Sequence, residues 1–339
     1  MYYFCTYFDK NYLPRGLALY HSLREHCHES TLWVLCMDHT SFEILEKLDL
    51  PGLCPISLEE FELNDEQLLG TKQNRSTIEY YFTCTPSLPL YILNHWLDVG
   101  LITYLDADLF FFDSPLPIFD EIGNKSIAII GHRFSPHLRD LESYGIYNVG
   151  WLSFRRDSNA FDCLKWWRQQ CIAWCYDREE NGQFADQKYL DDWPNRFSEV
   201  VVLKHKGANL APWNIGNYKM RSLHLNAVMV DEQPLIFFHF HGLKKISDWF
   251  YNPSWGEYDI NPSKVLRKKI YAPYLQSLSD ANRQILATHH TTLDYNVRSS
   301  LKNQRRKLPI LKRITLRLIT LAFFIRDLFT CRIIFFTNK

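Results

Sequence analysis

The first half of the chain alternates short apolar runs with segments in which apolar residues recur every three to four positions. The runs at residues 2–8 and 31–36 predict buried strands, and the 3.6-residue periodicity over 13–26 predicts a helix between them. Repeated strand–helix units of this kind favour an α/β fold with a mostly parallel sheet covered by helices. Such sheets bind ligands at the carboxyl ends of their strands.

Further elements follow from local signals. Ser41 is expected to cap a helix, and a helix over 87–98 is expected to stop near Gly100, before an apolar strand over 101–105. In the second half the same reasoning predicts strands over 148–154, 200–203 and 235–240, and helices over 157–175, 185–192 and 262–288.

Length and composition suit one large domain with appendages. The 339 residues are 46% apolar and 22% charged, which is typical of globular proteins. We expect a main α/β domain over residues 1–260, a helical extension over 261–301 and a basic amphipathic tail over 302–339.

The net charge of zero hides an asymmetry. Residues 302–339 hold ten Lys/Arg and one acidic residue, a local charge of +9. With 38 basic and 38 acidic residues in total, residues 1–301 therefore carry −9. An acidic body argues against nucleic-acid binding, while the basic tail suggests an anionic surface as partner.

The longest uncharged stretch near the end of the tail, Leu318–Ile325, has eight residues, far fewer than the ~20 that span a bilayer. The tail therefore predicts an interfacial segment on an anionic membrane, with the protein peripheral on the cytoplasmic face of the inner membrane. The alternative is a terminal helix that packs on the body or mediates oligomers. Nine cysteines without a CxxC pair, and no basic-then-apolar leader, favour reduced thiols in the cytoplasm.

Two carboxylates interrupt the apolar run that ends the strand over 101–105. In extended backbone the side chains of Asp106 and Asp108 point to the same side. Two carboxylates at the end of a buried strand repel each other and lose hydration, so a divalent cation bridging to a diphosphate would compensate them. The alternative is a solvated pair at a strand-to-loop junction.

A second apolar strand delivers His239 and His241, then Gly242 and two lysines. Imidazole binds a transition-metal ion such as Mn²⁺, and lysine neutralises phosphate charge. The alternative is a pair of hydrogen-bonded histidines followed by surface lysines. The segment Asn209–Asn214, with Trp213, has two open interpretations, a sugar platform or a structural loop.

Together these motifs resemble the GT-A-fold nucleotide-sugar glycosyltransferases, in particular the family 8-like branch. Five patterns of that family occur in its order over residues 1–250, although each one alone is weak. They are Asp9-Lys10-Asn11-Tyr12, the pair Asp106 and Asp108, Asn148-Val149-Gly150, Asp186-Gln187, and His239-Phe240-His241-Gly242-Leu243-Lys244-Lys245.

The resemblance implies a GT-A (Rossmann-like) fold and a metal-dependent sugar transfer from a nucleotide-diphosphate donor, UDP above all, to a glycan or lipid-linked acceptor, with retention. It also implies Mn²⁺ (or Mg²⁺) as cofactor. The roles it implies are uridine binding by Asp9, Asn11 and Tyr12; cation binding by Asp106, Asp108 and His239; diphosphate binding by Lys245; and contact with the transferred sugar and acceptor by Asn148, with Asp186 and Gln187 as catalytic residues.

Some features depart from the family pattern or stay open. Lys245 is followed by Ile-Ser where the family has Pro-Trp, which leaves the donor sugar and the stereochemical outcome open. Arg75 is placed to reach donor phosphates, but surface pairing explains it equally well. A non-catalytic nucleotide-sugar-binding protein of the same fold is the alternative to an enzyme. The acceptor, linkage, pathway and oligomeric state cannot be read from the sequence.

Overall fold

The computed structural model describes residues 1–223, 227–247, 249–289 and 332–336. Its centre is a seven-stranded sheet in which every strand but β7 runs in the same direction. The α/β prediction with a mostly parallel sheet is confirmed. The strand order is β3 (Leu53–Ser57), β2 (Ser30–Cys36), β1 (Tyr2–Phe8), β4 (Leu101–Leu105), β7 (Tyr147–Arg155), β6 (Ile127–Gly131), β8 (Val200–Leu203).

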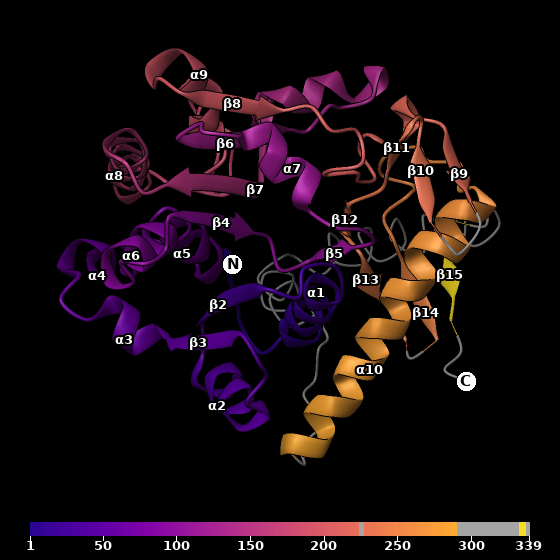
Figure 1. Cartoon of the computed structure of the whole chain (residues 1–339), viewed down its shortest axis with the longest axis horizontal. Helices are drawn as coiled ribbons and strands as arrows, with labels where there is room; N and C mark the ends of the chain where they lie inside the picture. The colour runs from indigo at the N-terminus through magenta and orange to yellow at the C-terminus, as the bar shows by residue number, and fades with distance from the viewer. Residues whose placement is uncertain (224–226, 248, 290–331, 337–339) are drawn as a thin grey trace, which may run out of the picture.

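Helices cover both faces of this sheet (Figure 1). Alternate side chains of each strand enter different cores, as Phe4 and Cys5 of β1 do, because side chains along a strand alternate between faces. The helices on the Phe4 side are α1 (Leu13–His26), α2 (His39–Leu48), α7 (Leu116–Ile122) and α10 (Ala272–His289). Those on the Cys5 side are α3 (Leu58–Glu62), α4 (Glu66–Thr71), α5 (Thr77–Cys84), α6 (Ser87–His95), α8 (Ser158–Ala173) and α9 (Trp193–Arg196).

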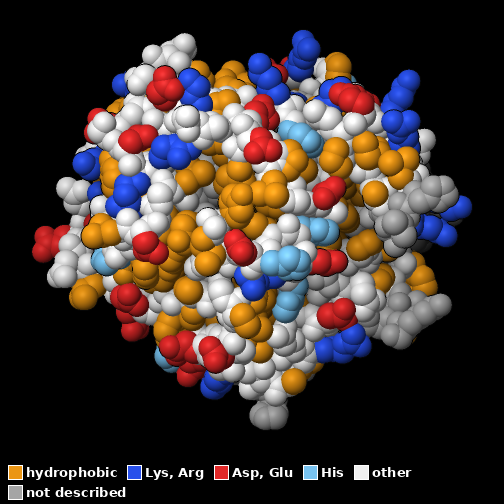
Figure 2. Space-filling model, in the orientation of Figure 1, with side chains coloured by type: hydrophobic (Ala, Val, Ile, Leu, Met, Phe, Trp, Pro, Cys, Tyr) orange, Lys and Arg blue, Asp and Glu red, His pale blue; other side chains and the backbone are white. Residues whose placement is uncertain are grey.

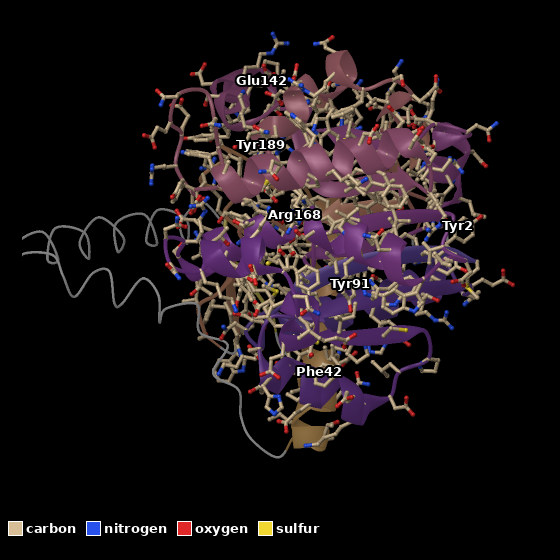
Figure 3. All side chains as sticks on the ribbon, turned by 90° about the vertical axis from the view of Figure 1, so that its left-hand side faces the viewer. Tyr2, Phe42, Tyr91, Glu142, Arg168 and Tyr189 are labelled. Carbon is tan, nitrogen blue, oxygen red and sulfur yellow. The ribbon has the colours of Figure 1, made fainter. Side chains whose placement is uncertain are left out.

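Polar contacts join the helices of the second layer. Arg168 of α8, seen in Figure 3, donates to both carboxylate oxygens of Asp65 at 2.6 Å and to the Ser87 hydroxyl at 3.1 Å. Since Asp65 caps α4 and Ser87 begins α6, one guanidinium fixes three helices.

Shorter elements build a third apolar cluster beside the sheet. Figure 1 shows them next to α10, which runs obliquely past α1. The strands are β5 (Leu109–Phe111) paired with β12 (Phe237–His239); β9 (Met220–Ser222), β10 (Val228–Val230) and β11 (Gln233–Pro234); and β13 (Lys244–Lys245), β14 (Phe250–Asn252) and β15 (Ile334–Phe335). Single-turn and irregular helices span Pro136–Tyr144, Lys188–Asp192, Ile215–Asn217 and Leu266–Tyr271.

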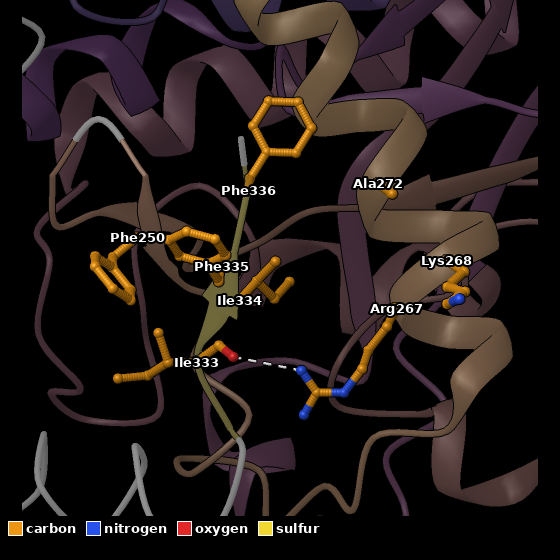
Figure 4. A pocket seen from close by; sticks show the side chains of 8 residues that line it. All are labelled: Phe250, Arg267, Lys268, Ala272, Ile333, Ile334, Phe335 and Phe336. Atoms are coloured by element: carbon orange, nitrogen blue, oxygen red, sulfur yellow. Dashed lines mark hydrogen bonds between the residues drawn. The ribbon is translucent and has the colours of Figure 1, made fainter. Parts of the chain in front are cut away.

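Residues 334–335, within the predicted tail, add a strand to β14. Figure 4 shows Phe335 beside Phe250, with ring centroids 5.2 Å apart, and Arg267 donating to the Ile333 carbonyl at 3.3 Å. These residues border a groove of about 500 Å³. Residues 302–331 of the predicted membrane tail lie outside the described part of the chain. Within that part, no helix is both long and apolar enough to cross a bilayer.

Several predicted element ends were wrong. Asp38, not Ser41, caps α2, and its carboxylate accepts the Ser41 N–H at 2.8 Å. The helix from Ser87 ends at His95 rather than 98, since Trp96 turns to extended backbone. The helix predicted over 185–192 is a 3₁₀ turn over Lys188–Asp192. The helix predicted over 262–288 is present, and it contains a π-helical segment over Leu266–Tyr271 before α10.

The cap of α8 gives a local stability prediction. Asp157 accepts the Ala160 N–H at 2.9 Å and the Ser126 hydroxyl at 2.7 Å. Asp157→Ala is expected to lower the free energy of unfolding by about 1–2 kcal/mol, measured by urea denaturation. Asp162→Ala, an exposed change on the same helix, is the control. Equal losses in the two variants would contradict the assigned cap.

Candidate metal centre and active site

The acidic pair follows β4 at the carboxyl end of the parallel strands. The prediction of extended backbone was wrong, because residues 107–108 form a turn in which the Leu109 N–H donates to the Asp106 carbonyl at 3.2 Å. The chain then enters β5, which pairs with β12 so that Leu109 faces His239. A backbone hydrogen bond of 2.9 Å from Phe240 to the Asp108 carbonyl fixes this register. Strand pairing therefore brings the histidine to the two aspartates.

Asp106, Asp108 and His239 meet at one point. His239 Nε2 lies 3.1 Å from Asp108 Oδ1 and 3.7 Å from Asp106 Oδ2. One ligand atom from each residue lies within 4.8 Å of the others. On the face of the molecule drawn in Figure 2, histidine and acidic side chains lie next to one another near the middle. Two carboxylate oxygens and one imidazole nitrogen form a donor set that fits Mn²⁺ better than Mg²⁺, which rarely takes a nitrogen ligand.

The electrostatics of the three groups differ. Burial raises the pKa of Asp106 to about 6, against the opposing effect of His239, and the nearby Asp108 adds to the rise. Burial also raises the pKa of Asp108, but His239 and Arg15 outweigh it and hold that pKa well below its usual range. The two carboxylates in turn raise the pKa of His239 against its own burial. The cluster therefore attracts positive charge, in the form of a proton or a cation.

Asn148 lies close to His239 across Gly150, and Gln187 is linked to Asn148. Asn148 Nδ2 is 3.2 Å from His132 Nε2 and 3.5 Å from Gln187 Oε1, and its Oδ1 accepts the Gly150 N–H. Gln187 also donates to the Tyr144 carbonyl at 3.1 Å. The neighbouring Asp186 is buried, which raises its pKa to about 7; a hydrogen bond from Thr85 opposes this rise, and Asp106 adds to it.

The turn after β1 is organised by Asp9. Its carboxylate accepts the Asn11 N–H and the Asn11 side-chain amide, both at 2.9 Å, and the Tyr12 N–H at 3.3 Å. Tyr12 is exposed and interacts electrostatically with Asp108. The structure therefore brings this turn to the same edge of the sheet as the acidic cluster.

Two further predicted site residues are Arg75 and Lys245. Arg75 donates to the Asn74 side chain at 2.9 Å and to the Ile172 carbonyl at 3.2 Å, and its guanidinium lies 4.0 Å from the Tyr176 ring centroid. These contacts account for Arg75 structurally, and its role in donor binding stays a prediction. Lys245 is exposed on β13, beyond the turn at Gly242.

Comparison with known protein sequences finds two relatives of this chain. Two proteins of Bacillus subtilis strain 168 are similar over most of their length. YfnD is 34% identical over 280 residues, which cover 82% of this chain and 88% of YfnD. YfnF is 33% identical over 302 residues, which cover 86% of this chain and 94% of YfnF. The chain belongs to the family of YfnD and YfnF. Both relatives are described as uncharacterized, and no protein-family model matches the chain.

Two solved structures similar to this YfnD-family chain are glycosyltransferases. The galactosyltransferase LgtC, in complex with donor and acceptor sugar analogues, is 15% identical with a TM-score of 0.49, over 86% of this chain and 98% of LgtC. Mouse xyloside xylosyltransferase 1 is 14% identical with a TM-score of 0.45, over 71% and 98% of the two chains. These TM-scores are below 0.5, so the activity has to be argued from the site itself.

Sequence reasoning missed Arg15 and His132. Arg15 lies one turn into α1, with its guanidinium 4.4 Å from the Tyr12 ring centroid, and it donates to the Leu243 carbonyl at 2.5 Å. It is a half-buried cation whose charge helps to lower the pKa of Asp108. Its position three residues after the Asp9–Tyr12 motif was the available signal. His132 follows β6 and is neutral, because burial lowers its pKa to about 3.

The interpretation of residues 209–214 as a structural loop is favoured. Trp213 donates its indole N–H to the His132 carbonyl at 2.9 Å, and Asn214 donates to the same oxygen at 2.8 Å. Asn209, Trp213 and Asn214 are buried. Since the Trp213 ring lies 5.1 Å from the His239 ring, the loop packs against the Asp106–Asp108–His239 cluster.

Gly150, on β7, gives a test of how His239 is held in place. A Cβ at position 150 would lie 2.5 Å from Asn148 Oδ1 and 3.1 Å from His239 Nδ1. Gly150→Ala is therefore expected to displace His239 and weaken Mn²⁺ binding by roughly 10–100-fold, measured by calorimetric titration of the folded protein. Gly100→Ala, where a Cβ meets nothing within 4 Å, is the control. Unchanged Mn²⁺ affinity in Gly150→Ala would show that His239 is not held in this way.

Proposed function

We propose that this protein is a metal-dependent glycosyltransferase that moves a sugar from a UDP-sugar to a glycan or lipid-linked acceptor, with retention of configuration. The observation that carries the proposal is the convergence of Asp106, Asp108 and His239 at the carboxyl end of β4. Ligands bind at this edge of parallel sheets, and a buried carboxylate pair needs a compensating cation.

The residues around the cluster suit a nucleotide diphosphate. Asp106, Asp108 and His239 would hold Mn²⁺, which when bound stabilises the negative charge on the leaving diphosphate. Arg15 and Lys245 add positive charge from α1 and β13. The Asp9-Lys10-Asn11-Tyr12 turn is our candidate for binding uracil and ribose, with its exposed Tyr12 ring and ordered polar groups.

The remaining groups suit the sugar and the acceptor. Asn148, which lies close to His239, forms a linked pair of amides with Gln187, and amides bind sugar hydroxyls as donors and acceptors. A front-face transfer with retention needs no dedicated strong base, so the Gln187 amide would support the anomeric centre. Asp186 would lie at the sugar side of the site, close enough to Asp106 for the two charges to interact.

The experiment that tests this function is a screen of nucleotide sugars for Mn²⁺-dependent release of UDP. We expect release with at least one UDP-sugar, its loss on chelation with EDTA and its recovery when Mn²⁺ is restored. Release that persists undiminished in EDTA would contradict a metal-dependent reaction. Tight UDP-sugar binding without turnover, even with acceptors added, would instead favour a non-catalytic binding protein.

The membrane proposal rests on the charge of the tail. Its ten Lys/Arg residues and apolar clusters suit the interface of an anionic bilayer. Because β15 belongs to the fold, the test is deletion of residues 302–329 rather than of the whole tail. Loss of cosedimentation with anionic vesicles is expected, and unchanged cosedimentation would overturn the proposal.

A further inference from the structure

Two side-chain amides at the sugar side of the proposed site are oriented by backbone groups. The Gly150 N–H can only donate, so the Asn148 atom 3.0 Å away is the amide oxygen. The Tyr144 carbonyl can only accept, so the Gln187 atom 3.1 Å away is the amide nitrogen. Asn148 Nδ2 then donates to Gln187 Oε1 at 3.5 Å. Turning either amide end for end would place two donors or two acceptors against each other.

A buried histidine continues this network into the interior. Asn148 Nδ2 also lies 3.2 Å from His132 Nε2. Because an amide nitrogen is only a donor, Nε2 must accept and carries no hydrogen. The single ring hydrogen is then on Nδ1. A protonated imidazole, which donates from both nitrogens, would not fit here, and burial lowers the pKa of His132 to about 3.

The His132 ring is fixed through its backbone and by packing. The His132 N–H donates to the Ile146 carbonyl at 2.9 Å. The His132 carbonyl accepts the Trp213 indole N–H at 2.9 Å and the Asn214 amide at 2.8 Å. The ring stacks on Phe134, with centroids 4.6 Å apart and 8° between the ring planes. An acceptor nitrogen in a fixed place therefore faces the amides.

Exposure increases along the network toward the side that a ligand can reach. His132 and Asn148 are each 5% exposed, whereas Gln187 is half-buried. Asn148 Nδ2 has two hydrogens and two partners, so it has none left for a ligand. Gln187 Nε2 has two hydrogens and one partner among the described residues, so it can donate the second to a sugar hydroxyl. Gln187 is thus the amide that donates to the sugar, and Asn148 holds it.

The two amides are also packed closely against glycines. A Cβ at position 150 would lie 2.5 Å from Asn148 Oδ1, and one at position 145 would lie 3.2 Å from Gln187 Nε2. Gly145 has a φ of 137°, which glycine adopts far more easily than other residues. Both amides are therefore confined as well as hydrogen-bonded.

We propose that His132 is a positioning residue: as a neutral ring that accepts at Nε2, it fixes the Asn148 amide and thereby holds Gln187 toward the transferred sugar. The inference rests on the proposed function, in which these two amides lie at the sugar side of the site. His132 acts through Asn148, which lies between it and Gln187. A phenylalanine at this position would stack on Phe134 equally well, so packing alone does not explain a histidine here.

Variants of His132 separate the accepting nitrogen from the shape of the ring. His132→Phe keeps a ring and removes the acceptor, whereas His132→Gln can place an amide oxygen where Nε2 lies. With the nucleotide sugar found in the screen, we expect His132→Phe to lower kcat by up to roughly 100-fold, because Gln187 is no longer held in place. His132→Gln is expected to retain most of the wild-type kcat.

Binding of UDP, which lacks the sugar, shows whether the damage is confined to the sugar side. Both His132 variants are expected to bind UDP with wild-type affinity, measured by calorimetry in the presence of Mn²⁺. A UDP affinity that falls as far as kcat in His132→Phe would overturn the positioning role, because the substitution would then have disturbed the whole site.

His205→Phe is the matched control. A ring nitrogen of His205 also accepts a hydrogen bond, but from the backbone N–H of Gly207 at 3.2 Å rather than from a side-chain amide. This variant should keep the wild-type kcat. A kcat for His132→Phe as high as that of His205→Phe would overturn the positioning role, and so would a His132→Gln variant as slow as His132→Phe. A wild-type enzyme without metal-dependent turnover would instead count against the proposed function.

A second readout does not depend on turnover. In the metal-free protein labelled with ¹⁵N at histidine, long-range ¹H–¹⁵N correlation spectra distinguish the two neutral tautomers of each ring. The signals that disappear in His132→Phe are expected to come from a neutral ring with its hydrogen on Nδ1. Should His132→Phe fail to fold, His132→Gln gives the same assignment. A ring with its hydrogen on Nε2, or a charged ring at neutral pH, would overturn the inference whatever the activity.

Discussion

Asp108→Asn is expected to lower the kcat of sugar transfer by about 10³-fold and to leave the fold intact. The substitution keeps the shape of the side chain and removes the negative charge that faces His239 and Arg15. The cation then loses an anionic ligand, and the charge on the leaving diphosphate loses the stabilisation that the cation provides. The measurement is steady-state release of UDP at saturating Mn²⁺, with circular dichroism as the check on folding.

Asp98→Asn is the control for this prediction, because Asp98 is exposed and precedes β4, whereas the acidic turn follows the opposite end of that strand. It removes the same charge and should retain wild-type kcat. An Asp108→Asn enzyme that turns over within a few-fold of the Asp98→Asn enzyme would show that Asp108 does not stabilise the reaction.

Trp151→Ala is expected to give the largest loss of stability, about 3–5 kcal/mol in the free energy of unfolding. Trp151 is fully buried on β7, and its ring stacks on Phe237 at 5.4 Å between centroids. It also contacts the rings of Phe4, Phe111 and Phe119 at 5.7–6.4 Å. Truncation removes this contact area and leaves a cavity in the core. The measurement is urea denaturation at fixed pH and salt.

The matched control is Trp249→Ala, since the Trp249 side chain is 60% exposed. Its truncation is expected to change the free energy of unfolding by less than about 1 kcal/mol. Because Phe111 and Phe237 lie on the strands that place Asp108 and His239, residual folded Trp151→Ala protein should also bind Mn²⁺ more weakly. A Trp151→Ala variant as stable as Trp249→Ala would mean that this part of the core is wrongly assigned.

The fold could be predicted where the hydrophobic pattern was unbroken. The strand over 2–8 and the helix over 13–26 agree with β1 and α1 to the residue, because each has an uninterrupted apolar run or face. Helix ends were harder. The Asp38 cap and the end of α6 at His95 depend on local backbone geometry, and several residues near these ends suit a cap or a stop equally well.

The site was predictable in its residue types and not in its geometry. The acidic pair and His239 are conspicuous polar residues in apolar surroundings, but they meet through the pairing of β5 with β12, two strands of three residues each. Pairing between segments more than a hundred residues apart leaves no local signal. Arg15 was missed for a similar reason, because only the fold shows that its helix begins beside Asp108.

Arg75 shows the opposite difficulty. An arginine shortly before the helices that lead to the acidic strand suits phosphate binding and structural pairing equally well. Its contacts with Ile172 and Tyr176 place it against α8 and the loop that follows. A positive charge in the sequence does not by itself say which buried carbonyl or ring it will meet.

The most direct test of the account is a titration of the folded protein with Mn²⁺, followed by the electron paramagnetic resonance signal of the free ion. The wild type is expected to bind one Mn²⁺, and His239→Ala to bind it at least about tenfold more weakly. His241→Ala, which removes the exposed neighbouring histidine, is expected to bind like the wild type. Equal Mn²⁺ affinity in the wild type and His239→Ala would contradict a cation site built from Asp106, Asp108 and His239.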